Sequence, residues 1–378
     1  MQLDTSSLQL NAQFPDWDKA PSWEDTSIAM KNSIPVWRSK MQAIEVNEIG
    51  TLTNSYTLSW GSLVVAPNGN LYSTPYAEAD GLVTMVNGYT GAVSQFTPTG
   101  LPTTGNTYWN RGILGKDGLI YMPPYATTNN VLVYTPAATN CTASYFSAGN
   151  YGWATGVLAG DGCIYCPPMT SSRQVLKIDT DPDSAGYQTT SLVSITFTQA
   201  FTSAHLRGDG KIIFFNNITT TYPYVYDPVA NTGVYMTRTG TQIGNSYGSA
   251  IDANGTLYQI APDTISTCKQ WNNHVYTKTQ ENNLSTYGIV LGPDGNMYTL
   301  SIDDADQIRQ IDTKTHKVRL FGPTLSANEY EGYGALAPNG NIYMLPYNST
   351  TKTVLEIDFG LTEPLPINFV CSPYINRF

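Results

Sequence analysis

One unit of about 45 residues occurs seven times in this chain, and this repeat constrains the fold more than any other feature. Each copy contains an Asn-Gly or Asp-Gly step, and the steps recur every 40–49 residues. Their glycines are Gly69, Gly118, Gly162, Gly210, Gly255, Gly295 and Gly340. Regular self-similarity at this period indicates one supersecondary unit used repeatedly.

The seventh copy, residues 333–358, shows why each unit forms a small sheet. A short apolar run ends at Pro338-Asn339-Gly340, three residues that suit a tight turn. Residues 341–345 are β-branched and aromatic, which favours a returning second strand, and residues 353–358 alternate apolar and polar as a third strand does. Earlier copies add a fourth extended run. Four antiparallel strands in one repeat are typical of a β-propeller blade.

The chain is therefore predicted to be all-β, with a seven-bladed β-propeller of four-stranded antiparallel blades over residues 56–378. A solenoid and two sandwiches are the competing folds. Solenoid repeats of this length are usually helical, and the sequence has no sustained 3.6-residue period. The outermost strand of blade seven is predicted to come either from residues 367–370 or from a segment near residues 44–52. The sequence leaves both alternatives open.

Residues 1–55 do not match the repeat and are predicted to form an extended, Trp-rich arm. They hold three of the seven tryptophans and lack a long periodic segment. Because a free arm of this kind would expose large apolar surface, we expect it to cap its own propeller, to close the ring or to anchor the chain to another subunit. Bulky aromatics are enriched at interface cores, which favours the anchor. The candidate anchor residues are Phe14, Trp17, Trp23 and Trp37.

A small residue opens the innermost strand of each copy, and the residue before it is predicted to lie at one mouth of the central channel. Four aromatic rings, one arginine and two hydroxyl groups would suit stacking on a sugar with a few directional hydrogen bonds. Packing at the mouth without a ligand is the alternative. These candidates are Trp60, Arg111, Thr155, Ser203, Tyr247, Tyr287 and Tyr333.

Other motifs are predicted to be structural. An aliphatic residue followed by an aromatic one recurs after each turn, as in Ile342-Tyr343, and function rarely needs every copy of a repeat. The five cysteines are expected to be buried free thiols, since Cys163 and Cys166 lie three apart on a strand and point to opposite faces.

No catalytic residue and no cofactor is predicted. Asp303, Asp304 and Asp306 form a weak candidate site for a hard cation, with a solvated turn as the simpler interpretation.

The composition limits the partners and the compartment. A net charge of −10 argues against a nucleic-acid backbone or an anionic membrane surface as the main partner. No apolar run approaches the length of a membrane-spanning helix, and the first residues lack the pattern of a signal peptide. We therefore expect synthesis in a cytoplasm. Only 13% of the residues are charged, while tyrosine is abundant, a composition common in extracellular and virion proteins.

The run Leu-Ala-Pro-Asn-Gly-Asn-Ile-Tyr at residues 336–343, followed by Val-Leu-Glu-Ile-Asp at 354–358, resembles β-propeller repeats of phage, other viral and microbial proteins. The resemblance covers about residues 56–360. The middle blades depart from it in two ways: other residues replace the turn proline and one phenylalanine replaces the tyrosine. The departures are Lys116, Gly160, Gly208, Ala253 and Phe214.

Taken whole, the chain resembles a virion structural protein of a phage. The resemblance implies a propeller displayed on capsid or tail for host attachment or decoration, made in the host cytoplasm and located in the virion. Its partners would be other virion proteins through the N-terminal arm, and a host-surface glycan. A glycan-acting lyase or hydrolase and a protein-interaction platform are the alternatives, because propellers host many unrelated functions.

Overall fold

The fold is taken from a computed structural model of the chain. The structure describes residues 23–376, apart from residues 54–61, 75–80, 102–108, 126–127, 151, 171–172, 198, 217–222, 237–247, 262–263, 269–275, 282–287, 301–306, 326–329 and 347–352.

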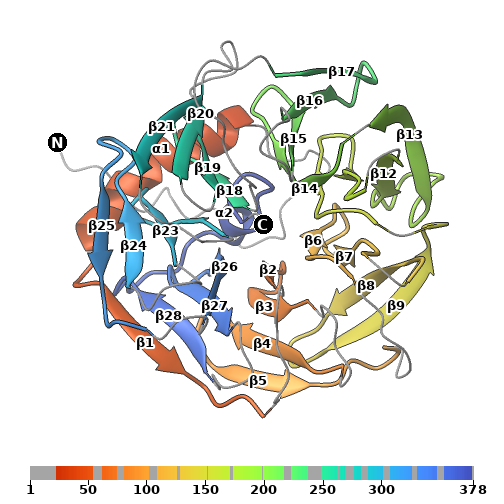
Figure 1. Cartoon of the computed structure of the whole chain (residues 1–378). Coiled ribbons are helices and arrows are strands. Elements are labelled where there is room, and N and C mark those ends of the chain that lie inside the picture. Colours follow the sequence, from red (N-terminus) through yellow and green to blue (C-terminus); the bar gives the residue numbers. More distant parts are fainter. Residues whose placement is uncertain are drawn as a thin grey trace.

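Seven four-stranded antiparallel sheets form a closed ring, which confirms the predicted seven-bladed propeller (Figure 1). Blade one contains β2 (Leu63–Val65), β3 (Asn70–Ser73), β4 (Val83–Asn87) and β5 (Val93–Phe96). Blade two contains β6 (Ile113–Leu114), β7 (Ile120–Met122), β8 (Asn130–Pro136) and β9 (Cys141–Ser147). Blade three contains β10 (Val157–Leu158), β11 (Cys163–Cys166), β12 (Arg173–Asp179) and β13 (Thr190–Phe197).

The chain continues around the ring in the same strand order. Blade four contains β14 (Phe201–Leu206), β15 (Ile212–Asn216), β16 (Tyr224–Asp227) and β17 (Thr232–Tyr235). Blade five contains β18 (Gly248–Ile251), β19 (Leu257–Ala261), β20 (Thr264–Cys268) and β21 (Tyr276–Glu281). Blade six contains β22 (Val290–Leu291), β23 (Met297–Thr299), β24 (Ile308–Ile311) and β25 (Val318–Phe321).

Blade seven joins the two ends of the chain. Its inner strands are β26 (Tyr330–Leu336), β27 (Ile342–Pro346) and β28 (Val354–Asp358), and its outermost strand is β1 (Glu45–Ile49). Strand β1 pairs antiparallel with β28, from Glu45 opposite Asp358 to Ile49 opposite Val354. Of the two closures that the sequence left open, the structure has the N-terminal one. The propeller therefore begins before residue 56.

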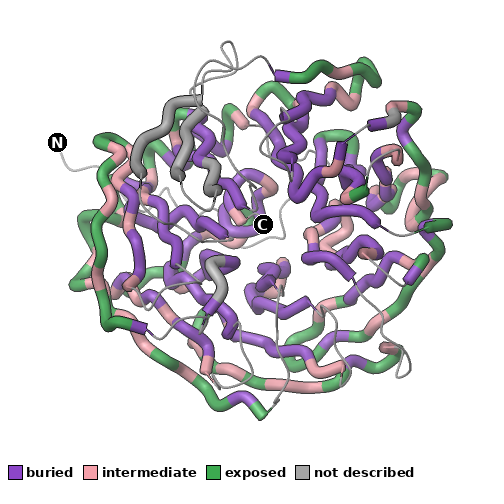
Figure 2. Tube along the Cα trace, in the orientation of Figure 1, coloured by how far each residue is buried: buried purple, intermediate pink, exposed green. Residues whose placement is uncertain are grey.

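The turn between the first and second strands of each blade takes the expected conformation. All seven repeat glycines have a positive φ, between 76° and 87°, a region that a side chain makes costly. Where the structure describes the side chains, burial decreases from the inner strands to the outermost strand of a blade, as from β2 to β5 in blade one (Figure 2).

The arm contains a helix, so the predicted extended conformation of residues 23–40 is wrong. Helix α1 (Trp23–Lys40) starts with acidic residues and ends with basic ones, as the helix dipole favours. Its buried face runs through Ser27, Met30 and Ile34, one turn apart, and includes too little apolar surface to stand out in the sequence. Pro35 also disfavours a helix interior. Neither α1 nor any other helix in the described part of the chain is long and apolar enough to cross a membrane.

Helix α1 lies across the first turns of three successive blades. The ring of Trp23 covers Gly208 of blade four and leaves no room there for a Cβ. Ser27 Oγ donates to the carbonyl oxygen of Ala253 in blade five at 3.4 Å. In blade six, Arg38 donates from Nε and Nη2 to the carbonyl oxygen of Asp294, at 3.0 Å for Nε.

The C-terminal segment, residues 359–376, covers the centre of the same side and includes α2 (Ile367–Val370) (Figure 1). Its Asn376 side chain exchanges two hydrogen bonds with the backbone of Leu336, at 2.7 and 2.8 Å. The ring of Trp37 packs edge-on against Phe369 at 5.0 Å, which joins α1 to this segment. We call the side that α1 and residues 359–376 cover the capped face.

Candidate functional site

Four of the seven predicted channel residues are described, and the structure buries all of them around the axis. Each lies just before or within the first strand of its blade, and each side chain is at most 5% exposed. We call these four residues, Arg111, Thr155, Ser203 and Tyr333, the axial cluster. The other three candidates, Trp60, Tyr247 and Tyr287, lie outside the described residues.

An aromatic residue two positions before each of the first two cluster members holds it in place. The indole N–H of Trp109 donates to the carbonyl oxygen of Asn130 at 2.8 Å, and that of Trp153 donates to Gln174 at 3.0 Å. Both tryptophans also bridge to a proline, Pro124 and Pro168, after the second strand of their blade. The spacing Trp-x-x-Gly in both copies is the sequence signal for this clamp, and the seven-fold repeat alone does not reveal it.

Asn110 connects blade two to blade three within the site. Its Oδ1 accepts a 2.8 Å hydrogen bond from the backbone N–H of Arg111 and a 2.9 Å hydrogen bond from Thr155 Oγ1. Its Nδ2 donates to the carbonyl oxygen of Trp153 at 3.2 Å. Thr155 in turn forms a backbone bridge to Ser203 of blade four. Three consecutive blades thus present one polar side chain each toward the axis.

Arg111 reaches across the channel to blade seven. Its guanidinium carbon lies 3.5 Å from the centre of the Tyr333 ring, a cation–π contact. Blade one lies between blades two and seven, so the side chain passes the inner edge of a whole blade. This face of Tyr333 is occupied by the guanidinium, and it does not offer the sugar-stacking surface that the sequence led us to expect there.

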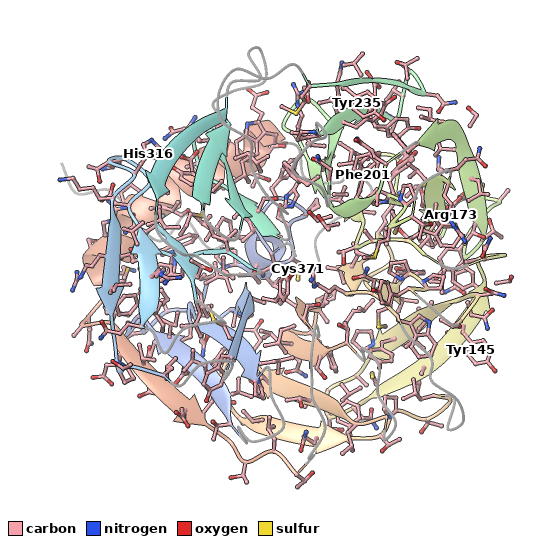
Figure 3. The ribbon with its side chains drawn as sticks, viewed as in Figure 1. Tyr145, Arg173, Phe201, Tyr235, His316 and Cys371 are labelled. Atoms are coloured by element: carbon pink, nitrogen blue, oxygen red, sulfur yellow. The ribbon has the colours of Figure 1, made fainter. Side chains whose placement is uncertain are left out.

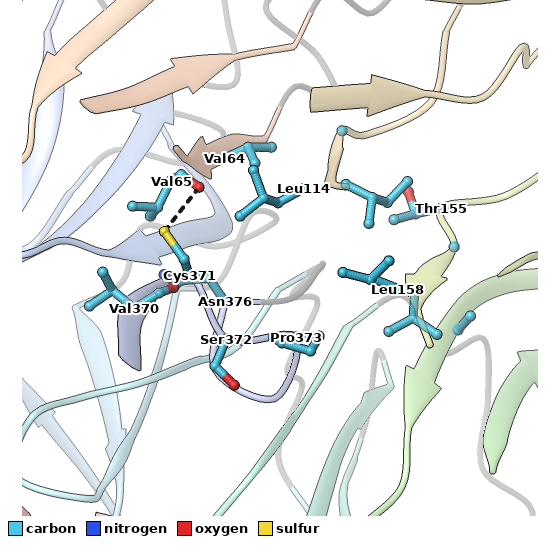
Figure 4. A pocket seen from close by; sticks show the side chains of 15 residues that line it. Val64, Val65, Leu114, Thr155, Leu158, Val370, Cys371, Ser372, Pro373 and Asn376 are labelled. Atoms are coloured by element: carbon cyan, nitrogen blue, oxygen red, sulfur yellow. Dashed lines mark hydrogen bonds between the residues drawn. The ribbon is translucent and has the colours of Figure 1, made fainter. Parts of the chain in front are cut away.

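A cavity of about 40 Å³ lies on the axis between the cluster and the C-terminal segment (Figure 4). Thr155 lines one end, and Val370, Cys371 and Ser372 close the other. Cys371 is held at this end by a contact of 3.7 Å from its Sγ to the carbonyl oxygen of Val65. A volume of this size has room for about three water molecules.

The predicted anchor residues divide into two pairs. Trp23 packs on Tyr374 with ring centres 5.3 Å apart, and Trp37 packs on Phe369, so both contact the chain's own C-terminal segment. Phe14 and Trp17 lie outside the described residues, as do Asp303, Asp304 and Asp306 of the weak cation site.

The structure describes the side chains of four of the five cysteines, and all four are buried free thiols, as predicted. Burial raises the pKa of the thiols of Cys141 and Cys163 to about 12, so neither is a reactive thiolate near neutral pH. Figure 3 shows Cys371 near the axis and Tyr145 at the outer edge of the ring.

Comparison with known proteins supports the fold alone. No protein-family model and no curated protein sequence matches the chain. Among solved structures, virginiamycin B lyase from Staphylococcus aureus has a TM-score of 0.62 at 14% identity, over 83% of this chain and 99% of the lyase. The WD40 repeats of RRP9 have a TM-score of 0.59 at 11% identity, over 84% and 99%. A fungal alcohol oxidase of the AA5 family has a TM-score of 0.61 at 12% identity, over 85% and 79%. The chain therefore has a β-propeller fold, which these proteins use for different functions.

Proposed function

We propose that this chain is a structural propeller of a phage virion, displayed on the capsid or tail for host attachment or decoration and held by its first residues. The observation that carries the proposal is the packing of Trp23 on the capped face, against Gly208 and Tyr374. Residues 1–22 precede Trp23 in the chain, so an anchor made by them would hold the capped face toward the particle and turn the opposite face outward.

We assign the anchor to a shorter segment than the sequence suggests. Residues 23–53 include α1 and β1, which cover and close the propeller itself. Phe14 and Trp17 remain the two large aromatic candidates for contact with another virion protein. Aromatic side chains are enriched at such interface cores, which supports this assignment.

The face opposite the capped one is suited to recognition. Because the strands of each blade alternate in direction, each first strand begins and each second strand ends at that face. A host-surface ligand, such as a glycan, would meet this face of the propeller first.

The alternative is an enzyme that acts on a glycan in the channel. The axial cavity of about 40 Å³ is small beside the roughly 300–1,000 Å³ of pockets that bind drug-sized ligands. Within the part of the chain that the structure describes, this volume favours the structural role.

Light scattering of the purified full-length chain tests the proposal. We expect the wild type to self-assemble or to bind its particle partner, and Phe14→Ser/Trp17→Ser to remain a folded monomer that does neither. Ile28→Ser is the matched control, because Ile28 is half exposed on the outer side of α1. The proposed anchor would be refuted if all three proteins assembled equally. It would also be refuted if the wild type stayed monomeric and did not bind isolated particles.

A further inference from the structure

We infer that the axial cluster binds a compact oxyanion, a carboxylate, sulfate or phosphate group, through the guanidinium of Arg111. This inference depends on the proposed function only for the origin of the ligand, which is either a free ion or the acidic group of a host glycan. Binding at the axis and assembly through residues 1–22 are measured separately, so either can fail alone.

Arg111 is buried and has no anionic partner among the described side chains. Its side chain is 5% exposed, its Nε is fully buried, and that atom has no hydrogen-bond partner within the described residues. Among the aspartates and glutamates whose side chains the structure describes, none forms an ion pair with it. A buried guanidinium without an anion carries a large desolvation cost, so an anionic ligand would stabilise it.

The Tyr333 ring determines from which direction a ligand can approach the guanidinium of Arg111. Tyr333 covers one face of the guanidinium at 3.5 Å and interacts with its charge. This stacking leaves the N–H groups, which lie in the guanidinium plane, for an acceptor. Two parallel N–H groups match the two oxygens of a carboxylate or phosphate, whereas chloride offers only one contact point.

Ser203 offers a second hydrogen-bond donor in the axial cluster. Ser203 is fully buried, and its Oγ has no hydrogen-bond partner within the described residues. It lies beside Thr155, whose own hydroxyl donates to Asn110 and keeps its lone pairs available. The axial cavity reaches this polar end at Thr155 and Gly112, the residue that follows Arg111. The axial cluster thus has a charged fork in Arg111 and an unpartnered hydroxyl group in Ser203. The cavity adjoins the cluster at Thr155 and Gly112, and neither Arg111 nor Ser203 lines it.

Calorimetric titration of the full-length chain provides the test. The probes are sodium phosphate, sodium sulfate and sodium glucuronate, each against sodium chloride at equal ionic strength. We expect saturable binding of at least one oxyanion, and Arg111→Gln should bind it at least about tenfold more weakly. Arg319→Gln removes one positive charge from an exposed position on β25 and should bind as the wild type does.

If Arg111→Gln does not fold, two further variants still test whether the guanidinium and the Ser203 hydroxyl bind the oxyanion. Arg111→Lys retains the charge and loses the fork, and Ser203→Ala retains the fork and loses the hydroxyl; we expect each to weaken binding several-fold. Tighter binding of glucuronate than of phosphate would indicate the acidic group of a glycan, and the reverse a free ion or a phosphate group. No saturable binding to the wild type, or equal binding by wild type and Arg111→Lys, would overturn the inference and leave Arg111 as a strut between blades two and seven.

Discussion

The hydroxyl group of Tyr121 donates a 2.6 Å hydrogen bond to Oδ2 of Asp117, four residues earlier in the first turn of blade two. Oδ1 of the same carboxylate accepts from the backbone N–H of Leu119 at 3.0 Å and shapes the turn. One acidic side chain therefore holds both the turn and the second strand. This contact explains why the Asn/Asp-Gly step and the aliphatic-aromatic pair recur together.

Other blades repeat the contact with small changes. The same carboxylate–tyrosine bond joins Asp161 to Tyr165 at 2.7 Å and Asp294 to Tyr298 at 2.9 Å. In blades one and seven an asparagine amide donates to the tyrosine oxygen instead: Asn68 to Tyr72 at 2.9 Å and Asn339 to Tyr343 at 2.7 Å.

Blade four is an informative exception. It has Phe214 in place of the tyrosine, and Asp209 instead accepts a 3.0 Å hydrogen bond from Nη2 of Arg207. The aspartate of this turn thus finds another donor when the hydroxyl group is absent.

Removing the tyrosine hydroxyl in blade two should destabilise the fold. We expect Tyr121→Phe to lower the free energy of unfolding by about 1–2 kcal/mol, because a largely buried carboxylate loses a donor. Tyr145→Phe is the control, since Tyr145 is 54% exposed on the outer strand β9. Urea denaturation measures both, and equal midpoints for the two variants would show that the contact contributes nothing.

The partly buried carboxyl of Asp117 should also make stability depend on pH. Burial raises its pKa above the usual value, so between the usual and the raised pKa the native state binds more protons than the unfolded chain. This contribution therefore falls as pH rises through that window. Asp117→Asn, the residue type that blades one and seven use, should remove that part of the fall.

Asp181 provides a control of opposite sign. The hydrogen bond from Lys116 Nζ, 2.7 Å long, holds the pKa of this carboxyl below its usual range. Its contribution is present above the usual pKa and is lost as pH falls toward the lowered one. From pH 3 to pH 7, the urea midpoint of Asp117→Asn should rise relative to that of the wild type, whereas the urea midpoint of Asp181→Asn should fall relative to it. Parallel changes would contradict the assignment.

Helix α1 should contribute to the stability of the propeller through its buried face. Met30 is fully buried, and truncating such a side chain to alanine costs about 2–5 kcal/mol. We expect Met30→Ala to lower the thermal midpoint clearly, while Ile28→Ala on the exposed side of the same helix changes it little. Similar small effects from both would mean that α1 does not dock in solution.

The repeat made the ring predictable, whereas the chain ends were not. Because the same unit occurs seven times, the clear turn sequence at Gly340 identifies the more divergent copy of the turn at Gly210. Helix α1 occurs once, contains Pro35 and buries only a narrow stripe, so no period reveals it. Its contacts with Gly208 and Asp294 join residues far apart in sequence, which local pattern does not encode.

The sequence predicts where the axial cluster lies along the blades, but not which contacts its side chains form or how far they are buried. The small residue after each member placed Arg111 and Tyr333 at the inner end of their blades. Their contact crosses blade one, and only the geometry of a closed ring brings the guanidinium onto the tyrosine. Closure of the ring also buries Ser203, whereas the repeat pattern alone predicts it at the mouth of the channel.

Thermal unfolding of two shortened chains tests most directly whether β1 closes the ring and α1 caps it. A chain that begins at Trp23 keeps α1 and β1, and its midpoint should lie within about 2 °C of the full-length value. A chain that begins at Thr51 loses both and opens blade seven, so its midpoint should fall by about 5 °C or more, or it should not fold. Equal stability of the Thr51 chain and the full-length protein would contradict the account.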